Sequence, residues 1–445
     1  MHSNLKFFII LLIIMTSQQT IRCQIVSYEL IKHWSKEEVS DLYMEYSIPE
    51  STGEINYAVD GYKVLYFTPD YNGELVICSG AIFLPVEIGC SPPVISWQHG
   101  TISKKSAAPS NIGNTNNDLM GVLTASHGYI ATMSDFIGLG EGEGLHNYVH
   151  ADTEASATID LIIYGKQFAT EMLGIAPNDQ LFLYGYSQGG HATMAAVKEI
   201  EENYSDQLNI TGSCPMAGPY DMSGAQRLML ETGLPYPNPG YLPYVLFAYN
   251  KIYNLYDEID NVLIPPYNST LLDMYDGTNS MWTINYMLPE TPINIFWASY
   301  YQEYLNNAEH PFKIALADND VYNFTPQSPM RLLHCSGDDN VTYENAEIAY
   351  DYFIESGAEN IELIDGGNFN HSDCAFMAII GAKIWIDGLA EICEPTNIKE
   401  ELNNQNKQLI TTIDFLGRRI SPNKSQSHII NVYSDGTHQK TISIK

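Results

Sequence analysis

Short apolar stretches alternate with longer amphipathic ones over most of the chain. The early stretches are rich in β-branched and aromatic residues and predict strands at Tyr62–Phe67, Leu75–Leu84, Pro93–Trp97 and Tyr129–Met133. Ser35–Glu45 opens with a serine followed three residues later by a glutamate, which predicts a capped helix.

The pattern changes further along, where Thr153–Leu173 has helical periodicity and Gln180–Tyr184 is a short apolar run that predicts a buried strand. A second helix is predicted from Gly190 onward. Strands that alternate with helices after a β-rich start predict an α/β sheet, antiparallel at first and parallel later.

The alternation stops between Met216 and Pro329, a region dense in Tyr, Pro and Asn. Tyr249, Tyr253 and Tyr256 follow helical spacing there, so residues 216–329 are predicted to form a mainly helical cap inserted in the sheet. The alternation then resumes, with predicted strands at Met330–Cys335 and Ile361–Ile364 and helices at Tyr343–Ser356 and Asp373–Leu389. The core is therefore predicted to comprise residues 24–215 and 330–393.

Both ends of the chain differ from this core. Residues 1–23 carry an early Lys6 and an apolar run from Phe7 to Met15, which predicts a signal peptide too short to span a bilayer. Residues 394–408 are polar and predict a linker. In residues 409–445 basic residues outnumber acidic ones, and short β-like pieces flank Asp435-Gly436, which indicates a separate C-terminal appendage.

The composition of the 445-residue chain excludes several classes of function. Its formal net charge of -32 repels nucleic acid and anionic lipid headgroups, so a nucleic-acid partner is not expected. No segment after the signal peptide is long and apolar enough to predict stable membrane insertion, and the mature protein is expected to be exported. Some of the six cysteines beyond Cys23 should pair in an oxidising compartment, with the connectivity left open. No C-x-x-C pair is present, so no zinc site is predicted.

Gly185-Tyr186-Ser187-Gln188-Gly189 lies between the predicted strand and the following helix. A G-x-S-x-G sequence in that context is typical of a nucleophile elbow, where a strained turn presents the serine and the glycines let strand and helix approach each other. The alternative is an ordinary glycine-rich turn between two elements.

An attacking serine needs a base, and the base needs an acid to orient it. In chains with this elbow the order is serine, acid, histidine. His371, in the loop after strand Ile361–Ile364, is the only histidine of the core beyond the last predicted strands. The strand Met330–Cys335 ends at a turn that holds both Asp338 and Asp339, and the pattern leaves either as the acid.

The oxyanion hole of such a site combines two backbone N–H groups. One should come from Gln188, the residue after the serine, and the other from the loop that contains Gly100 and Thr101. His99 competes as a base, but it precedes the serine and fits the oxyanion loop better.

Together these pieces resemble the secretory lipase/esterase branch of the α/β-hydrolase superfamily. The matching segments are Trp97–Thr101, Ser134–Gly140, Gly185–Gly190, Gly218–Asp221, Asp338–Val341 and His371–Ala375. The resemblance implies the α/β-hydrolase fold over roughly residues 27–390, and its D-x-x-V acid turn selects Asp338. Residues 409–445 resemble a C-terminal sorting tail of the type IX secretion system, which implies the secretion machinery as a partner.

The sequence thus predicts a secreted serine ester hydrolase with Ser187, His371 and Asp338 as catalytic residues and no cofactor. Its expected substrates are uncharged or weakly polar esters, either small or polymeric. One alternative is a peptidase or amidase on the same fold, because the same triad serves both acyl-transfer reactions. Another is a non-catalytic cell-surface binding protein that keeps the fold.

Overall fold

The structure is a computed structural model and describes residues 25–392, 409–414, 428–433 and 438–442. The chain divides into two compact units, residues 1–393 and 394–445. The predicted signal peptide, the whole predicted linker and the Leu416–Arg419 and Ser434–Gly436 pieces of the tail lie outside the described residues.

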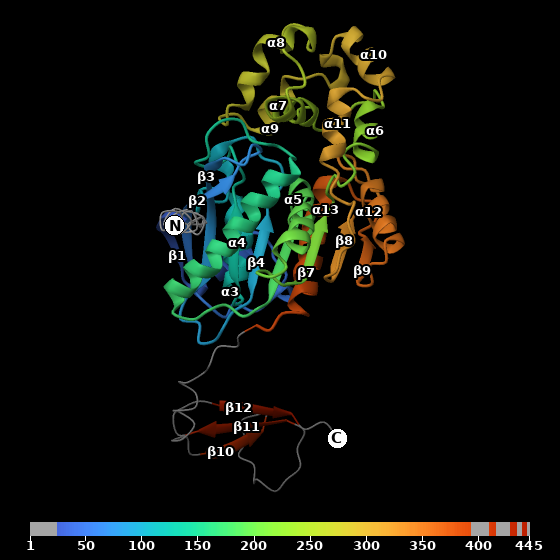
Figure 1. Ribbon diagram of the computed structural model, residues 1–445. Helices are drawn as coiled ribbons and strands as arrows, with labels where there is room; N and C mark the ends of the chain where they lie inside the picture. The colour runs from blue at the N-terminus through green and yellow to red at the C-terminus, as the bar shows by residue number, and fades with distance from the viewer. Residues whose placement is uncertain (1–24, 393–408, 415–427, 434–437, 443–445) are drawn as a thin grey trace, which may run out of the picture. The chain divides into compact units, whose positions relative to one another are not determined.

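A nine-stranded sheet with the order β1-β2-β3-β5-β4-β6-β7-β8-β9 forms the centre of the first unit (Figure 1). Strands β1, β2, β3 and β5 pair antiparallel, whereas β5, β4, β6, β7, β8 and β9 pair parallel. The strands are β1 (Ile25–Trp34), β2 (Val59–Pro69), β3 (Leu75–Pro85), β4 (Val94–Gln98), β5 (Ile130–Ser134), β6 (Leu181–Tyr186), β7 (Ile210–Met216), β8 (Met330–His334) and β9 (Ile361–Asp365). The predicted change from antiparallel to parallel pairing is confirmed.

Helices cover both faces of the sheet, and each face has its own apolar cluster. Along β6, Leu181 and Leu183 pack on the face covered by α4 (Ala151–Leu173), α5 (Gln188–Glu199) and α12 (Glu344–Glu355). Phe182 and Tyr184 pack on the opposite face, under α2 (Lys36–Glu45), α3 (Leu119–Ser126) and α13 (His371–Asp387). This alternation follows from the two-residue period of a strand.

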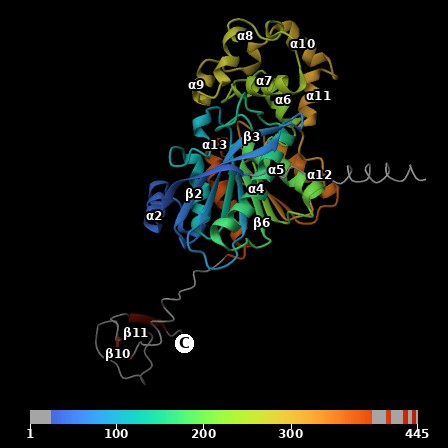
Figure 2. The ribbon, with the colours of Figure 1, turned by 60° about the vertical axis from the view of Figure 1, so that its left-hand side comes forward.

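Between β7 and β8 the chain forms six helices, which group at one end of the sheet in both views (Figures 1 and 2). They are α6 (Ala225–Glu231), α7 (Tyr241–Tyr253), α8 (Tyr267–Thr270), α9 (Met281–Tyr286), α10 (Ala298–Asn306) and α11 (Pro311–Asp318). An apolar cluster of their own, rich in tyrosine, holds them together. The inserted, mainly helical cap is therefore present.

Two strands of the nine-stranded sheet were not predicted. β1 lies at the edge of the sheet, is largely exposed and has two irregularities in its pairing with β2. It therefore lacks the alternation of buried and exposed residues from which a strand can be predicted. β7 contains Gly212 and Pro215, residues that normally mark turns, yet it is buried between β6 and β8.

The predicted helix after β9 begins earlier than expected. His371 was predicted on a loop, but it is the first residue of α13. The side chain of Asn370 caps this helix by accepting a hydrogen bond from the N–H of Asp373 at 2.9 Å. The sequence prediction overlooked this cap, and its consequence is that a helix rather than a flexible loop holds His371.

In the second unit, β10 (Leu409–Asp414), β11 (His428–Tyr433) and β12 (His438–Ile442) form a three-stranded antiparallel sheet. The β-like pieces of the predicted tail are thus strands. Its role as a sorting tail stays a prediction.

The cysteines and helices of the described part bear on two further expectations. A disulfide joins Cys335 to Cys374, Cys90 is also disulfide-bonded, and Cys78 and Cys214 are buried free thiols. No helix within the described ranges has the length and apolarity to cross a membrane.

Candidate active site

Ser187 occupies the sharp turn between β6 and α5. Its backbone has φ +63° and ψ -122°, a conformation that residues other than glycine rarely adopt. The turn is held by the N–H of Ser187, which donates to the carbonyl of Met216 at 2.9 Å. A Cβ added at Gly185 or Gly189 would lie 2.6 Å or 2.0 Å from the carbonyl oxygen of Gln98. Only glycine fits at these two positions, as the nucleophile elbow requires.

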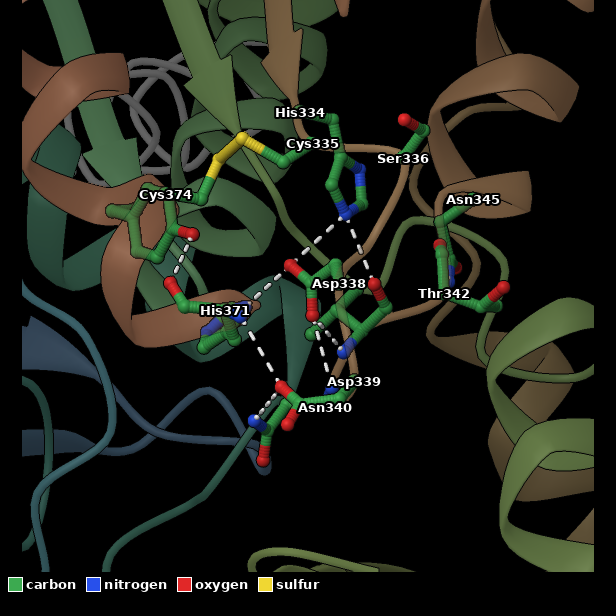
Figure 3. Close-up of polar contacts among 12 residues, drawn as sticks. His334, Cys335, Ser336, Asp338, Asp339, Asn340, Thr342, Asn345, His371 and Cys374 are labelled. Carbon is green, nitrogen blue, oxygen red and sulfur yellow. Dashed lines mark hydrogen bonds and ion pairs between the residues drawn. A yellow bond between two sulfur atoms is a disulfide. The ribbon is translucent and has the colours of Figure 1, made fainter. Parts of the chain in front are cut away.

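Asp338 and His371 meet at the carboxyl ends of β8 and β9 (Figure 3). Nδ1 of His371 lies 2.6 Å from Oδ2 of Asp338. Oδ1 of Asp338 accepts the N–H groups of Asn340 at 2.9 Å and Val341 at 2.8 Å, so both carboxylate oxygens are fixed. Because the carboxylate accepts from Nδ1, the proton of a neutral imidazole lies on Nδ1 and Nε2 is left to accept.

Asp339, the other acid of the turn, has a different contact. Its Oδ1 accepts the backbone N–H of His371 at 3.2 Å and does not face the imidazole. The structure therefore places Asp338, the residue selected by the family resemblance, on the histidine ring. Asp339 tethers the start of α13.

Sequence reasoning missed His334, which lies behind Asp338 (Figure 3). Its Nε2 is 3.0 Å from the carbonyl of Val341 and 3.3 Å from Oδ2 of Asp338. Burial would raise the pKa of Asp338, but the hydrogen bonds from His334 and His371 outweigh it and hold the pKa well below its usual range. The sequence signal was a histidine at the end of a buried strand, four residues before the acid.

Tyr186 and a disulfide tie the histidine to the rest of the site. The hydroxyl of Tyr186 donates to the carbonyl of His371 at 2.7 Å, and the two ring centroids are 4.9 Å apart. Since Tyr186 immediately precedes Ser187, this contact places His371 beside the elbow. The Cys335–Cys374 disulfide joins the end of β8 to the first turn of α13, so the acid and the histidine turns are linked covalently.

Ser187 and His371 are 8% and 7% exposed, so both are largely shielded yet still reachable from solvent. In the part of the chain that the structure describes, neither Oγ of Ser187 nor Nε2 of His371 has a hydrogen-bond partner. Such hydrogen bonds often form only once substrate is bound. Both atoms can therefore accept a new hydrogen-bond partner.

The loop after β4 lies against the elbow. A Cβ on Gly100 would lie 3.3 Å from the carbonyl oxygen of Tyr186 and 3.8 Å from Cβ of Ser187. Within the described ranges, the backbone N–H groups of Gly100, Thr101 and Gln188 have no acceptor. Unpaired N–H groups beside a serine can hold a negatively charged oxygen.

His99 does not compete as a base. Its Nδ1 lies 2.7 Å from the carbonyl of Gly100 and its Nε2 lies 3.3 Å from the carbonyl of Asp135. Burial lowers the pKa of His99. It supports the shape of the loop, as the sequence prediction preferred.

The cap and the loop before α4 together supply an aromatic wall over this loop. Tyr148 and Tyr244 stack with ring centroids 4.3 Å apart, and the hydroxyl of Tyr148 lies 2.8 Å from Oγ1 of Thr101. Near the acid turn, the hydroxyl of Tyr236 donates to the carbonyl of Asn340 at 2.7 Å. Tyr236 also lines a groove of about 740 Å³ whose rim carries Trp282 and Tyr286, 76% and 80% exposed.

Comparisons with known proteins agree with this geometry. The model of the secretory lipase family matches residues 108–389, a span that includes the elbow, the cap, the acid turn and His371. No curated protein matches the chain.

Solved structures show the same fold. A candidate hydrolase from Legionella pneumophila superposes with a TM-score of 0.76 at 25% identity, covering 82% of this chain and 98% of that one. The ligand-bound form of the rice cell wall degrading esterase LipA from Xanthomonas oryzae gives 0.73 at 26% identity, with the same coverage. Lipase A from Candida antarctica is more distant, with a TM-score of 0.58 at 15% identity over 78% of this chain and 77% of its own, and shows the fold alone.

The family match covers more than half of the sequence, and the sheet, the cap and the elbow agree with it. The chain therefore belongs to the secretory lipase family and is a carboxylic ester hydrolase with the α/β-hydrolase fold.

Proposed function

We propose that the protein is an exported serine esterase or lipase in which Ser187 is the nucleophile, His371 the base and Asp338 the acid that orients it. The observation that carries the proposal is the hydrogen bond of 2.6 Å between Nδ1 of His371 and Oδ2 of Asp338, beside a serine on a strained turn. Nε2 of His371 is left free to take a proton.

The reaction would proceed through an acyl-enzyme. Oγ of Ser187 attacks the ester carbonyl carbon while its proton moves to Nε2 of His371, and the carbonyl oxygen becomes the oxyanion. When the tetrahedral intermediate collapses, the bond to the alcohol oxygen breaks and His371 returns the proton to the leaving alcohol. Water then attacks the acyl-enzyme by the same route and releases the acid.

Each remaining group has a role in that sequence. Asp338, with its pKa held low, stays ionised and stabilises the imidazolium that forms on His371. The N–H of Gln188 and one from the Gly100/Thr101 loop would bind the oxyanion, since they are unpaired and lie beside the serine. No step needs a cofactor.

The substrate is proposed to be an uncharged or weakly polar ester. The aromatic wall over the oxyanion loop and the groove beside the acid turn present apolar groups and uncharged amide groups to a substrate. The acidic surface, with a formal net charge of -32, disfavours anionic substrates. A series of chromogenic esters from acetyl to palmitoyl should show a preference among neutral acyl chains, and a preference for anionic esters would contradict the proposal.

Replacement of Ser187 tests the chemistry. Ser187→Ala should lower kcat for a chromogenic ester by several orders of magnitude, because no other group supplies the nucleophile. A fluorophosphonate probe should label the wild-type protein and not the variant. Unchanged turnover by a folded Ser187→Ala protein would refute the assignment.

Export and the role of the tail are tested separately. Fractionation of producing cells should recover activity outside the cell, and deletion of residues 409–445 should retain the protein within it. Activity that stays inside with the full chain would refute export, and normal release after the deletion would refute the sorting role of the tail.

A further inference from the structure

A second buried cluster is connected to the elbow through Gln188, the residue that follows Ser187. It consists of Glu154 on α4, Gln188 and His191 on α5, and His146 on the loop before α4. All four side chains are buried: Glu154 and Gln188 are each 1% exposed, and His191 is 0% exposed. None of them was assigned a side-chain role in the chemistry above, although Gln188 provides an oxyanion N–H.

Gln188 is held at both hydrogens of its side-chain amide. Its Nε2 donates to Oε1 of Glu154 at 2.8 Å and lies 2.8 Å from Nε2 of His146. The reverse orientation would place the amide oxygen against the carboxylate, so the acceptors fix which way the amide points. Both N–H groups of the Gln188 side-chain amide are therefore hydrogen-bonded, whereas its Oε1 is buried without a partner in the described structure.

The histidines on either side complete the pattern. Nδ1 of His146 lies 2.8 Å from the carbonyl of Ile137, so it donates there and Nε2 accepts from Gln188. This is the neutral form, in keeping with burial that lowers the pKa of His146 to about 3. His191 faces two acceptors, Oε2 of Glu154 at 2.7 Å and the carbonyl of Asn319 at 3.0 Å, so both of its nitrogens donate.

A buried carboxylate is costly unless it is paired and hydrogen-bonded. Glu154 meets that condition through His191 on one oxygen and Gln188 on the other. Because Gln188 is the first residue of α5 and directly follows Ser187, a fixed side chain restrains the rotation of its backbone N–H. A hydrogen-bond donor stabilises a transition state only if it already points where the charge develops.

From this geometry we infer that Glu154 is a positioning residue for the oxyanion hole, acting through the side chain of Gln188. His146 and His191 support it from either side. The inference rests on the proposed function, since it assigns Glu154 to the transition state of that reaction. Glu154 touches neither Ser187 nor substrate.

Two substitutions of Glu154 separate positioning from packing. Glu154→Leu removes both acceptors and should lower kcat for a chromogenic acetyl ester about tenfold or more with KM nearly unchanged, because the oxyanion is bound only during the reaction. Glu154→Gln can still accept from Gln188 and donate to a neutral His191, so it should retain most of the wild-type kcat.

The readout specific to the oxyanion is a trifluoromethyl ketone, which forms a tetrahedral adduct with the serine. Its affinity should fall for Glu154→Leu by the same factor as kcat/KM, whereas the affinity of an unreactive ether analogue of the ester should not change. Asp160→Leu is the matched control, because Asp160 is a buried carboxylate of the same helix whose side chain contacts Tyr164 and not the elbow. It should leave kcat and ketone affinity near wild type.

Gln188→Met removes the amide from the other side of the contact and should reproduce the loss in kcat, which keeps the test available if Glu154→Leu does not fold. The inference is overturned if folded Glu154→Leu or Gln188→Met keeps kcat within threefold of wild type. It is also overturned if the ketone and the ether lose affinity equally. Failure of the proposed function itself would appear differently, as full turnover by Ser187→Ala.

Discussion

Two histidine–carboxylate pairs flank Ser187, and their contacts are almost equally short. Nδ1 of His371 lies 2.6 Å from Asp338, and Nδ1 of His191 lies 2.7 Å from Glu154. They differ in what the second nitrogen does. Nε2 of His191 is bonded to the carbonyl of Asn319 in a fully buried site, whereas Nε2 of His371 has no partner in the described structure.

In the proposed mechanism, that difference separates the reactive pair from the structural one. A general base must have a nitrogen that can accept a proton from the nucleophile, and a histidine with both nitrogens donating cannot do so. Proximity to a carboxylate is common to both pairs. The unpaired Nε2 of His371 is what distinguishes it.

The largest expected contrast comes from removing each histidine. His371→Ala should lower kcat by roughly 10⁴-fold or more with a smaller loss of stability than His191→Ala, because Asp338 keeps its contacts with His334, Asn340 and Val341. His191→Ala should do the reverse. It leaves the buried carboxylate of Glu154 without its ionic partner, which typically costs about 3–5 kcal/mol.

Ester kinetics and urea unfolding of the two variants would measure this contrast. A His191→Ala protein that is as stable as wild type, or a His371→Ala protein that retains a tenth of the activity, would show that the two pairs have been assigned to the wrong roles.

Asp338→Asn should give the next largest loss, roughly 10⁴-fold in kcat. The amide cannot stabilise an imidazolium and favours the wrong tautomer of His371. The pKa of Asp338 is held well below its usual range, so ionised Asp338 stabilises the folded protein. This contribution to the free energy of unfolding is complete at pH values above the pKa of Asp338 in the unfolded chain. It is lost only as pH falls through the lower pKa of the folded protein. Turnover that differs less than tenfold between Asp338→Asn and wild type would reject this role, with Asp339→Asn as the control that should be far milder.

Removal of the Cys335–Cys374 disulfide should have a smaller effect, and this effect concerns only the Asp338–His371 pair. Cys335 and Cys374 are 39 residues apart and join the acid and histidine turns, whereas α4 and α5, which carry Glu154 and His191, contain no cysteine. Cys335→Ala with Cys374→Ala should reduce the free energy of unfolding by about 4 kcal/mol, with kcat of the folded enzyme reduced less than tenfold. Chemical denaturation with and without reductant would measure it, and an unchanged midpoint would count against the linkage.

The contrast between the pairs also explains what the sequence could predict. Ser187 and Asp338 lie on turns after strands and His371 begins the helix after β9, and local patterns and the order along the chain identify all three. The elbow was readable because its glycines are required within a few residues of the serine. The order of the elements, the cap and the change from antiparallel to parallel pairing followed from periodicity in the same way.

The residues that were missed depend on packing between separate elements. Glu154 and His191 meet only because α4 and α5 pack side by side, and a glutamate in the first turn of a helix is normally interpreted as a favourable charge at the helix end. His334 reaches Asp338 because the chain turns back after β8. His371 is the first residue of α13 because Asn370 caps the helix there, and this local signal could have been recognised in the sequence.

The smallest effect concerns a third buried carboxylate, which has no histidine. Burial raises the pKa of Asp160 to about 6, and its Oδ2 has no partner among the described residues. The unfolded chain ionises this group near its ordinary pKa of about 4, so the stability contribution of Asp160 falls as pH rises from about 4 to 6 and stays low above that. Asp160→Asn should therefore raise the free energy of unfolding at pH 8 by roughly 1–3 kcal/mol and change it little at pH 4. Urea unfolding of both proteins at the two pH values would measure the difference. An equal gain at both pH values would mean that the carboxylate of Asp160 is not the source of the cost.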